Sequence, residues 1–185
     1  MRAAMRALVA RVPTKAVRDQ EMNSATKKPV RVLAIDPGFD RMGIAVVEGD
    51  PSRPTLVWSD CVVPPKGTVE ERLSVIQRAA AEAITKYEPD VFALETLFFS
   101  SNVKTALGVA EARGAVLAAA GAAGCRVIEC SPQEVKLAVT GYGAADKKAV
   151  AQMLPHLLTL SPKKRFDDEL DAIAVGICAL TKSRK

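Results

Sequence analysis

Short apolar runs dominate the chain once a polar and basic start has been passed. The first run, Val32–Ile35, predicts a buried strand that ends at Asp36, and Pro37-Gly38 then predicts a tight turn. Two further runs, Met42–Val47 and Thr55–Val63, predict the second and third strands. Because only short polar turns separate these runs, we expect the three strands to form an antiparallel meander.

The rest of the chain alternates between helical spacing and short apolar runs. Thr68 opens a Thr-x-x-Glu capping box, and apolar residues at helical spacing follow it as far as Pro89. The later elements expected are a strand at 90–95, an Ala/Gly-rich helix at 102–123, a strand at 126–130, a short helix after Ser131, a helix at 145–158 and a final helix after 165. A helix precedes the fourth strand, so this strand can lie parallel to an earlier one. The order predicts an α/β fold with a mixed five-stranded sheet, in which three antiparallel strands are followed by parallel strands, and with helices on both faces.

The positive charge of the chain is concentrated at its start. The 185 residues carry a formal net charge of +5. Residues 1–29 hold seven Lys/Arg and two Asp/Glu, which accounts for the whole excess. A transit peptide, a disordered basic leader and a misassigned start codon all suit this composition. We predict a leader at 1–29, most simply a disordered one, followed by a single domain at 30–182.

Two features of the composition restrict the cellular setting. No apolar run reaches the 18 residues of a membrane span. The four cysteines are scattered, mostly within apolar runs, and none forms a Cys-x-x-Cys pair. This pattern is typical of reduced, buried thiols. We therefore expect a protein of the cytoplasm.

Four carboxylates occupy positions where folding can bring them together. Asp36 and Glu95 each end a predicted buried strand, whereas Asp168 and Asp171 lie three residues apart on the final helix and share a face. Each has an ordinary interpretation, as a turn initiator, a strand-end residue or an acid that complements the helix dipole, as Glu169 also would. Taken together, the four would repel one another unless cations hold them ionised. Two Mg²⁺ ions about 3.5–4 Å apart would balance these charges and clamp the reacting oxygens of a phosphodiester.

Three segments resemble the acidic motifs of a known family. They are IDPG at 35–38, ALE at 93–95 and DELDAIAVG at 168–176. These motifs, in this order, are similar to those of the RuvC-type Holliday junction resolvases within the ribonuclease H-like superfamily, and the resemblance extends over about 30–180. It implies a ribonuclease H-like fold and a catalytic tetrad that binds two Mg²⁺ ions, for which Mn²⁺ can substitute. The implied tetrad comprises Asp36, Glu95, Asp168 and Asp171.

The same resemblance implies residues that contact DNA. Phe98 matches an aromatic residue that stacks on an unpaired base, although on its own it is typical of a core residue at a strand-to-helix junction. Lys136 and Lys147 match two lysines that contact phosphate near the scissile bond, although helix lysines are usually solvated. Lys163 and Arg165 are among further cations that are candidates for the DNA surface. The last motif contains no histidine, so metal-bound water is the expected nucleophile.

The resemblance implies an endonuclease that resolves four-way DNA junctions by symmetric, Mg²⁺-dependent hydrolysis during recombination and repair. Two symmetric nicks suit a C2 homodimer, with the Ala/Gly-rich helix at 102–123 as the candidate interface. A RuvA–RuvB branch-migration complex is the implied partner. Three alternatives stay open: a ribonuclease H-like nuclease that processes ribosomal RNA precursors, a domain of the sugar-kinase/actin class, and a junction-binding protein without catalysis. The second needs two such domains around a nucleotide, and the third gives no reason for four carboxylates beside phosphate.

Overall fold

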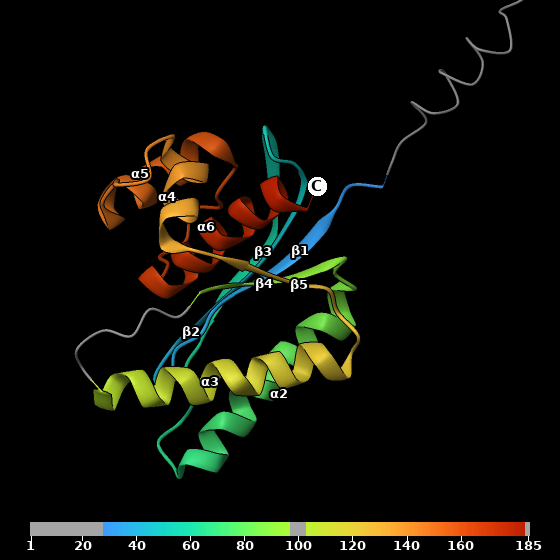
Figure 1. Ribbon diagram of the computed structural model, residues 1–185, viewed down its shortest axis with the longest axis vertical. Helices are drawn as coiled ribbons and strands as arrows, with labels where there is room; N and C mark the ends of the chain where they lie inside the picture. The colour runs from blue at the N-terminus through green and yellow to red at the C-terminus, as the bar shows by residue number, and fades with distance from the viewer. Residues whose placement is uncertain (1–27, 97–102, 184–185) are drawn as a thin grey trace, which may run out of the picture.

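A five-stranded sheet forms the centre of the molecule. The computed structural model describes residues 28–96 and 103–183. The strands are β1 (Arg31–Asp36), β2 (Met42–Asp50), β3 (Arg53–Val62), β4 (Val91–Glu95) and β5 (Val127–Cys130). They lie in the order β3-β2-β1-β4-β5 (Figure 1). The first three pair antiparallel, and β4 pairs parallel with both β1 and β5, which confirms the predicted mixed sheet.

Helices cover both faces of this sheet, as predicted. One face carries α2 (Val69–Tyr87) and α3 (Val103–Ala122), and the other carries α4 (Pro132–Thr140), α5 (Lys147–Leu157) and α6 (Asp167–Lys182) (Figure 1). In β1, Val32 and Ala34 pack toward α6, whereas Leu33 and Ile35 pack toward α2 and α3. Successive side chains of a strand point to opposite faces, so a strand covered on both faces is apolar throughout. This explains why the first apolar run is continuous.

The hairpin of β2 and β3 is longer than the sequence pattern predicted. We expected the second strand to end at Val47, before the polar residues 48–50, but its pairing continues to Asp50, which lies opposite Arg53. Gly49 allows this continuation because its φ of +108° is open to glycine and strained for other residues. The polar residues mark the part-exposed end of the hairpin and not a break in the strand.

Capping side chains set the helix ends where the sequence indicated. Thr68 and Glu71 form a capping box at the start of α2. Ser131 and Glu134 do the same at α4, where the Ser131 backbone N–H donates to Glu134 Oε2 at 2.7 Å. Each box satisfies two N–H groups that the first helical turn leaves without partners. Gly141, with a φ of +75°, ends α4 at the predicted interruption.

Most of the leader predicted at 1–29 lies outside the described residues, so that prediction stays a prediction. In the parts of the chain that the structure does describe, no helix has the length and apolar character needed to cross a membrane. All four cysteines are free thiols, as expected. Cys130 and Cys178 are buried, whereas Cys61 and Cys125 are partly exposed.

Candidate active site

Asp36 and Glu95 end two neighbouring strands at one edge of the sheet. β1 and β4 run parallel, with Ile35 opposite Leu94. The next residue of each strand is the acid, so both carboxylates leave the sheet side by side. On its other side Asp36 pairs with Gly43 of β2. Asp36 therefore lies between the antiparallel and the parallel halves of the sheet.

The first turn of α6 rests directly on this edge because Gly43 has no side chain. A Cβ atom built on Gly43 would overlap the carbonyl oxygen of Asp168, so only glycine permits this approach. Since Gly43 is the partner of Asp36 in the β1–β2 ladder, the start of α6 lies beside Asp36. Asp171 follows three residues after Asp168, on the same face of the helix.

The electrostatics of Asp36 show that the four acids lie close together. The pKa of its carboxyl is raised from 3.8 to about 7, first by burial and then by the negative charges of Asp171, Glu95 and Asp168. The positive charge of Lys147 opposes this rise only in part. The pKa values of Glu95 and Asp171 are also raised, chiefly by burial. Like charges shift one another's pKa in this way only at short range, so the fold assembles one acidic cluster.

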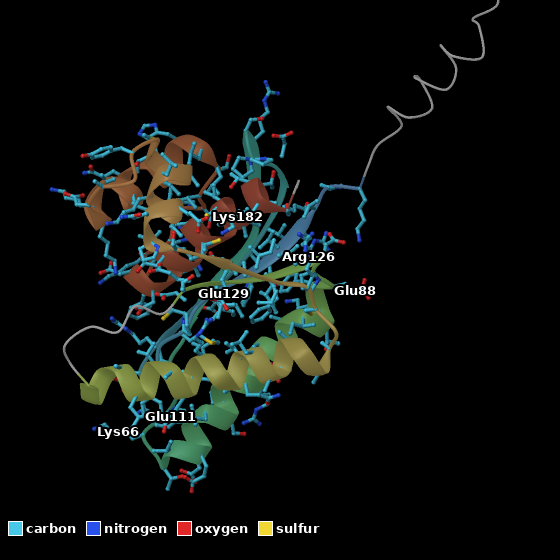
Figure 2. The ribbon with its side chains drawn as sticks, viewed as in Figure 1. Lys66, Glu88, Glu111, Arg126, Glu129 and Lys182 are labelled. Atoms are coloured by element: carbon cyan, nitrogen blue, oxygen red, sulfur yellow. The ribbon has the colours of Figure 1, made fainter. Side chains whose placement is uncertain are left out.

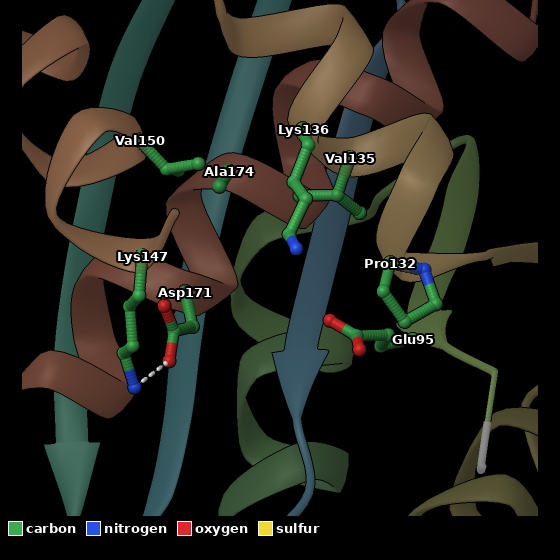
Figure 3. Close-up of a pocket in the computed structure, with 8 residues that line it drawn as sticks. All are labelled: Glu95, Pro132, Val135, Lys136, Lys147, Val150, Asp171 and Ala174. Carbon is green, nitrogen blue, oxygen red and sulfur yellow. Dashed lines mark ion pairs between the residues drawn. The ribbon is translucent and has the colours of Figure 1, made fainter. Parts of the chain in front are cut away.

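A cavity of about 200 Å³ opens beside this cluster. Its lining comprises Glu95, Pro132, Val135, Lys136, Lys147, Val150, Asp171 and Ala174. In Figure 3, Lys136 and Glu95 extend into the cavity from one side, and Lys147 and Asp171 extend from the other. Both lysines implied by the resemblance therefore share an opening with two of the acids.

Two cations hold the acids of α6. The Nζ atom of Lys147 lies 2.7 Å from Oδ2 of Asp171, and the Nε atom of Arg41 lies 3.0 Å from Oδ2 of Asp168. The N–H group of Arg41 is not aligned with that oxygen, so Oδ2 of Asp168 is buried without a hydrogen-bond partner among the described residues. Sequence reasoning missed Arg41, because only the fold brings it to Asp168.

The donor set of the cluster fits a hard divalent cation. Four carboxylates offer oxygen ligands alone, and such ligands are the ones that Mg²⁺ prefers. The raised pKa of Asp36 and the unpartnered oxygen of Asp168 are both relieved by a nearby cation. Within residues 28–96 and 103–183, no three Asp, Glu, His or Cys side chains yet converge closely enough to hold an ion. Asp168 and Asp171 are instead each engaged in an ion pair, with Arg41 and Lys147 respectively.

Glu169 is buried, and its contacts hold the start of α6 in place. Its position in the sequence had suggested instead an acid that complements the helix dipole. It is only 3% exposed, and its Oε1 accepts a hydrogen bond from Ser59 Oγ at 2.6 Å. The same oxygen lies 2.8 Å from Lys163 Nζ and 3.2 Å from Arg165 Nε. This network ties the start of α6 to β3 and to the preceding loop. It also occupies Lys163 and Arg165 within the protein, although the sequence made them candidates for the DNA surface.

Arg113 fixes the end of β4. Its guanidinium donates to the carbonyl oxygen of Glu95 at 3.4 Å and lies 2.8 Å from Oε1 of Glu129 on β5. The Arg113 side chain is only 12% exposed, so it stabilises the fold from a largely buried position and is not a surface cation. Phe98, the remaining candidate residue, lies outside the described residues.

A mixed five-stranded sheet with acids at two adjacent strand ends, completed by acids from a covering helix, defines a nuclease of the ribonuclease H-like class. The family model for the crossover junction endodeoxyribonuclease RuvC matches residues 32–179. The chain belongs to this family, whose nucleases are metal-dependent.

Individual relatives agree with this assignment. The crossover junction endodeoxyribonuclease RuvC of Thermomicrobium roseum is 41% identical over 155 residues, which cover 84% of this chain and 95% of the relative. Thermus thermophilus RuvC, solved in complex with a Holliday junction substrate, is 32% identical with a TM-score of 0.78, and the match covers 84% of this chain and 95% of that one. A yeast mitochondrial Holliday junction resolvase has a TM-score of 0.63 at 12% identity, over 90% of this chain and 86% of that one, which shows the shared fold. The predicted fold and family are both confirmed.

Proposed function

We propose that this chain resolves Holliday junctions by metal-dependent hydrolysis of phosphodiester bonds, in recombination and repair. The observation that carries the proposal is that β1, β4 and α6 each bring acids to the same edge of the sheet, with two lysines lining the adjoining cavity. Acids alone would repel nucleic acid, and lysines alone would only bind it, so the combination suits cleavage of a bound phosphodiester. The Thermus thermophilus relative, solved with a Holliday junction substrate, supports a junction as the target.

Four carboxylates would hold the metal, and we propose two Mg²⁺ ions, with Mn²⁺ able to replace them. They belong to Asp36, Glu95, Asp168 and Asp171. Bound metal supplies an activated water and neutralises charge that develops on the phosphate. Asp36 is central, because its pKa is shifted by each of the other three acids. The protein itself positions these ligands, through the adjacent ends of β1 and β4 and through the close contact of α6 with β2.

Three further residues would bind the DNA. Lys136 and Lys147 line the cavity and would contact the phosphates next to the cut. Lys147 now pairs with Asp171, and it becomes available to phosphate once that carboxylate has a metal partner. Phe98 would stack on an unpaired base near the crossover, a contact worth about 1–3 kcal/mol for a single base.

The outer face of α3 is our candidate for a homodimer interface. Cβ atoms built on Gly114 and Gly121 would meet open space, and Leu107 is 62% exposed. The opposite face of the helix, with Ala112 and Val116, is buried against the sheet. Small residues allow a second helix to approach closely, and C2 symmetry would present two sites for two symmetric nicks. A RuvA–RuvB branch-migration complex would act on the same junction.

A ribonuclease H-like nuclease that processes RNA is the main alternative, because the acidic edge alone would serve either substrate. Lys136 and Lys147 favour the junction, since both match lysines of the resolvase motifs and both line the cavity beside Glu95 and Asp171. A sugar-kinase or actin-class function would need a second domain of the same fold around a nucleotide. The described residues form one sheet.

One cleavage experiment tests the proposal. The full chain is incubated with a synthetic four-way junction, a linear duplex of the same sequence and an RNA–DNA hybrid, each with Mg²⁺ or with EDTA. We expect paired symmetric nicks in the junction, in Mg²⁺ only. Asp36→Asn should abolish cutting and preserve junction binding, because it removes a metal ligand and not a phosphate contact. Preferential cutting of duplex or hybrid would contradict the proposal.

A further inference from the structure

Arg41 reaches the acidic cluster from a different part of the fold than the two lysines. It immediately precedes β2, whereas Lys136 and Lys147 belong to α4 and α5. The Arg41 side chain is 48% exposed, and its guanidinium carbon lies 5.5 Å from the centre of the Phe166 ring. An aromatic ring under a guanidinium supports one of its faces through a cation–π interaction. Phe166 therefore helps to hold the Arg41 side chain at the mouth of the site.

Most of the hydrogen-bonding capacity of Arg41 is unused. A guanidinium has five N–H donors, and the one anionic contact of Arg41 among the described residues is the misaligned Nε contact to Asp168. Two other arginines of this region donate hydrogen bonds within the protein through their terminal nitrogens. Arg165 donates through both terminal nitrogens to Ser161, and Arg72 donates to the carbonyl oxygen of residue 39 and to the carboxylate of residue 40. Among the described residues, the terminal nitrogens of Arg41 have no anionic partner, so they can bind an external anion.

A DNA strand that crosses the cluster needs cations on both of its sides. The chain after residue 29 has no net charge, so phosphates are attracted only where cations are placed locally. Lys136 and Lys147 supply cations on the sides of Glu95 and Asp171 respectively, and Arg41 is the cation beside Asp168. A part-exposed ion pair such as that of Arg41 and Asp168 is weak, so exchange of its partners is cheap.

We propose that Arg41 is a third phosphate-binding residue, which exchanges Asp168 for a DNA phosphate when Asp168 ligates metal. In the metal-free protein Arg41 partly neutralises Asp168 and keeps its terminal donors at the mouth of the site. Once Asp168 ligates metal, the guanidinium is free to bind a phosphate of the DNA backbone beside the start of β2. The inference rests on the proposed function and adds to it a DNA contact that depends on metal.

The test measures binding of the full chain to a labelled four-way junction over a range of salt concentrations. Ca²⁺ replaces Mg²⁺ in this assay, because it binds the same carboxylate oxygens. A gel verifies that the junction stays uncut during the measurement. In Ca²⁺, Arg41→Gln should bind about tenfold more weakly, because a charge-assisted hydrogen bond is lost. The slope of log affinity against log salt should fall by about 0.9, as expected for one lost phosphate contact. In EDTA the loss should be much smaller, because Asp168 without metal keeps its negative charge beside the guanidinium and repels an incoming phosphate.

Two further variants make the result decisive. Arg126→Gln removes the same charge at the opposite end of the sheet, where β5 begins (Figure 2). It should change neither the affinity for the junction nor the slope of log affinity against log salt. Asp168→Asn frees Arg41 without metal, so adding Arg41→Gln to this variant should weaken binding even in EDTA. Urea unfolding confirms that each variant is folded.

The inference is overturned if Arg41→Gln behaves like Arg126→Gln in Ca²⁺, or if its loss is equal in Ca²⁺ and EDTA. The outcome can be separated from that of the proposed function. A natural chain that binds duplex as tightly as a junction would contradict junction resolution. The salt slope of Arg41→Gln, measured on that duplex, would still decide whether Arg41 contacts phosphate.

Discussion

Replacing Asp36 with Asn should make the metal-free protein more stable at pH 8. The pKa of Asp36 is about 7 in the folded protein, against 3.8 for an unperturbed carboxyl. One pKa unit corresponds to about 1.4 kcal/mol, so ionising this side chain costs the folded protein at most roughly 4 kcal/mol. Asparagine has nearly the same shape and no charge. The variant therefore avoids a cost that burial and three neighbouring acids impose on the natural chain.

The pH dependence of this effect has a definite sign. The folded protein binds the Asp36 proton more tightly than the unfolded chain, so the free energy of unfolding falls as the pH rises from about 4 to about 7. Above that range the carboxyl is ionised in both states, and the loss is complete. Asp36→Asn lacks this dependence. The variant should differ little from the natural chain at pH 4 and should gain up to roughly 4 kcal/mol at pH 8.

Urea unfolding in EDTA at pH 4, 6 and 8 measures this difference. Glu82→Gln, on the exposed side of α2, removes one negative charge away from the cluster and serves as the control. Added Mg²⁺ at pH 8 should stabilise the natural chain more than Asp36→Asn, because a ligand of the folded state stabilises it in proportion to its affinity. If Asp36→Asn is no more stable than the natural chain at pH 8, ionisation of Asp36 does not lower the free energy of unfolding. A bound cation would then have no such loss to offset, and the reasoning would be refuted.

Two further substitutions test how α6 is held. Gly43→Ala should raise the Mg²⁺ concentration needed for half-maximal junction cutting, because a methyl group there pushes the first turn of α6 off β2. Gly176→Ala, whose added methyl group meets the buried side chain of Val47 farther along α6, controls for a general disturbance of this helix, and an equal Mg²⁺ requirement in the two variants would refute this role. Glu169→Gln should lower the free energy of unfolding by about 3 kcal/mol in urea titrations, because it leaves Arg165 buried without its carboxylate. A loss below about 1 kcal/mol would show that this network is worth no more than a surface ion pair.

The sequence predicted the fold correctly where the local residue pattern and the burial of the segment favour the same element. The continuous apolar run of β1 indicated a buried strand, and Thr68 and Ser131 marked the starts of two helices. The end of β2 was misjudged, because a polar segment with Gly49 is equally typical of a turn and of a hairpin tip. In α3, apolar and small residues surround the helix, so no periodicity told its buried face from its outer face.

The sequence predicted only those parts of the site that the backbone alone positions. Asp36 and Glu95 could be located because each ends a strand, and parallel pairing then brings them to one edge. The partners of the α6 acids were not accessible, since the reach of a side chain such as Arg41 depends on the loop before β2 and on the Phe166 ring. Glu169 was misjudged for a similar reason. Its burial follows from how α6 docks on β3, which no local pattern encodes.

The acidic cluster is completed by α6, the last helix that the structure describes. β1 and β4 carry their acids in the first half of the sequence, whereas α6 is the C-terminal element of the fold. Synthesis proceeds from the N-terminus, so a growing chain displays Asp36 and Glu95 well before Asp168 and Asp171 exist. Such a chain also lacks the helix that covers one face of the sheet. If the four acids hold the metal as proposed, a chain in which α6 has not yet been made or has not docked has an incomplete site and should not cut DNA.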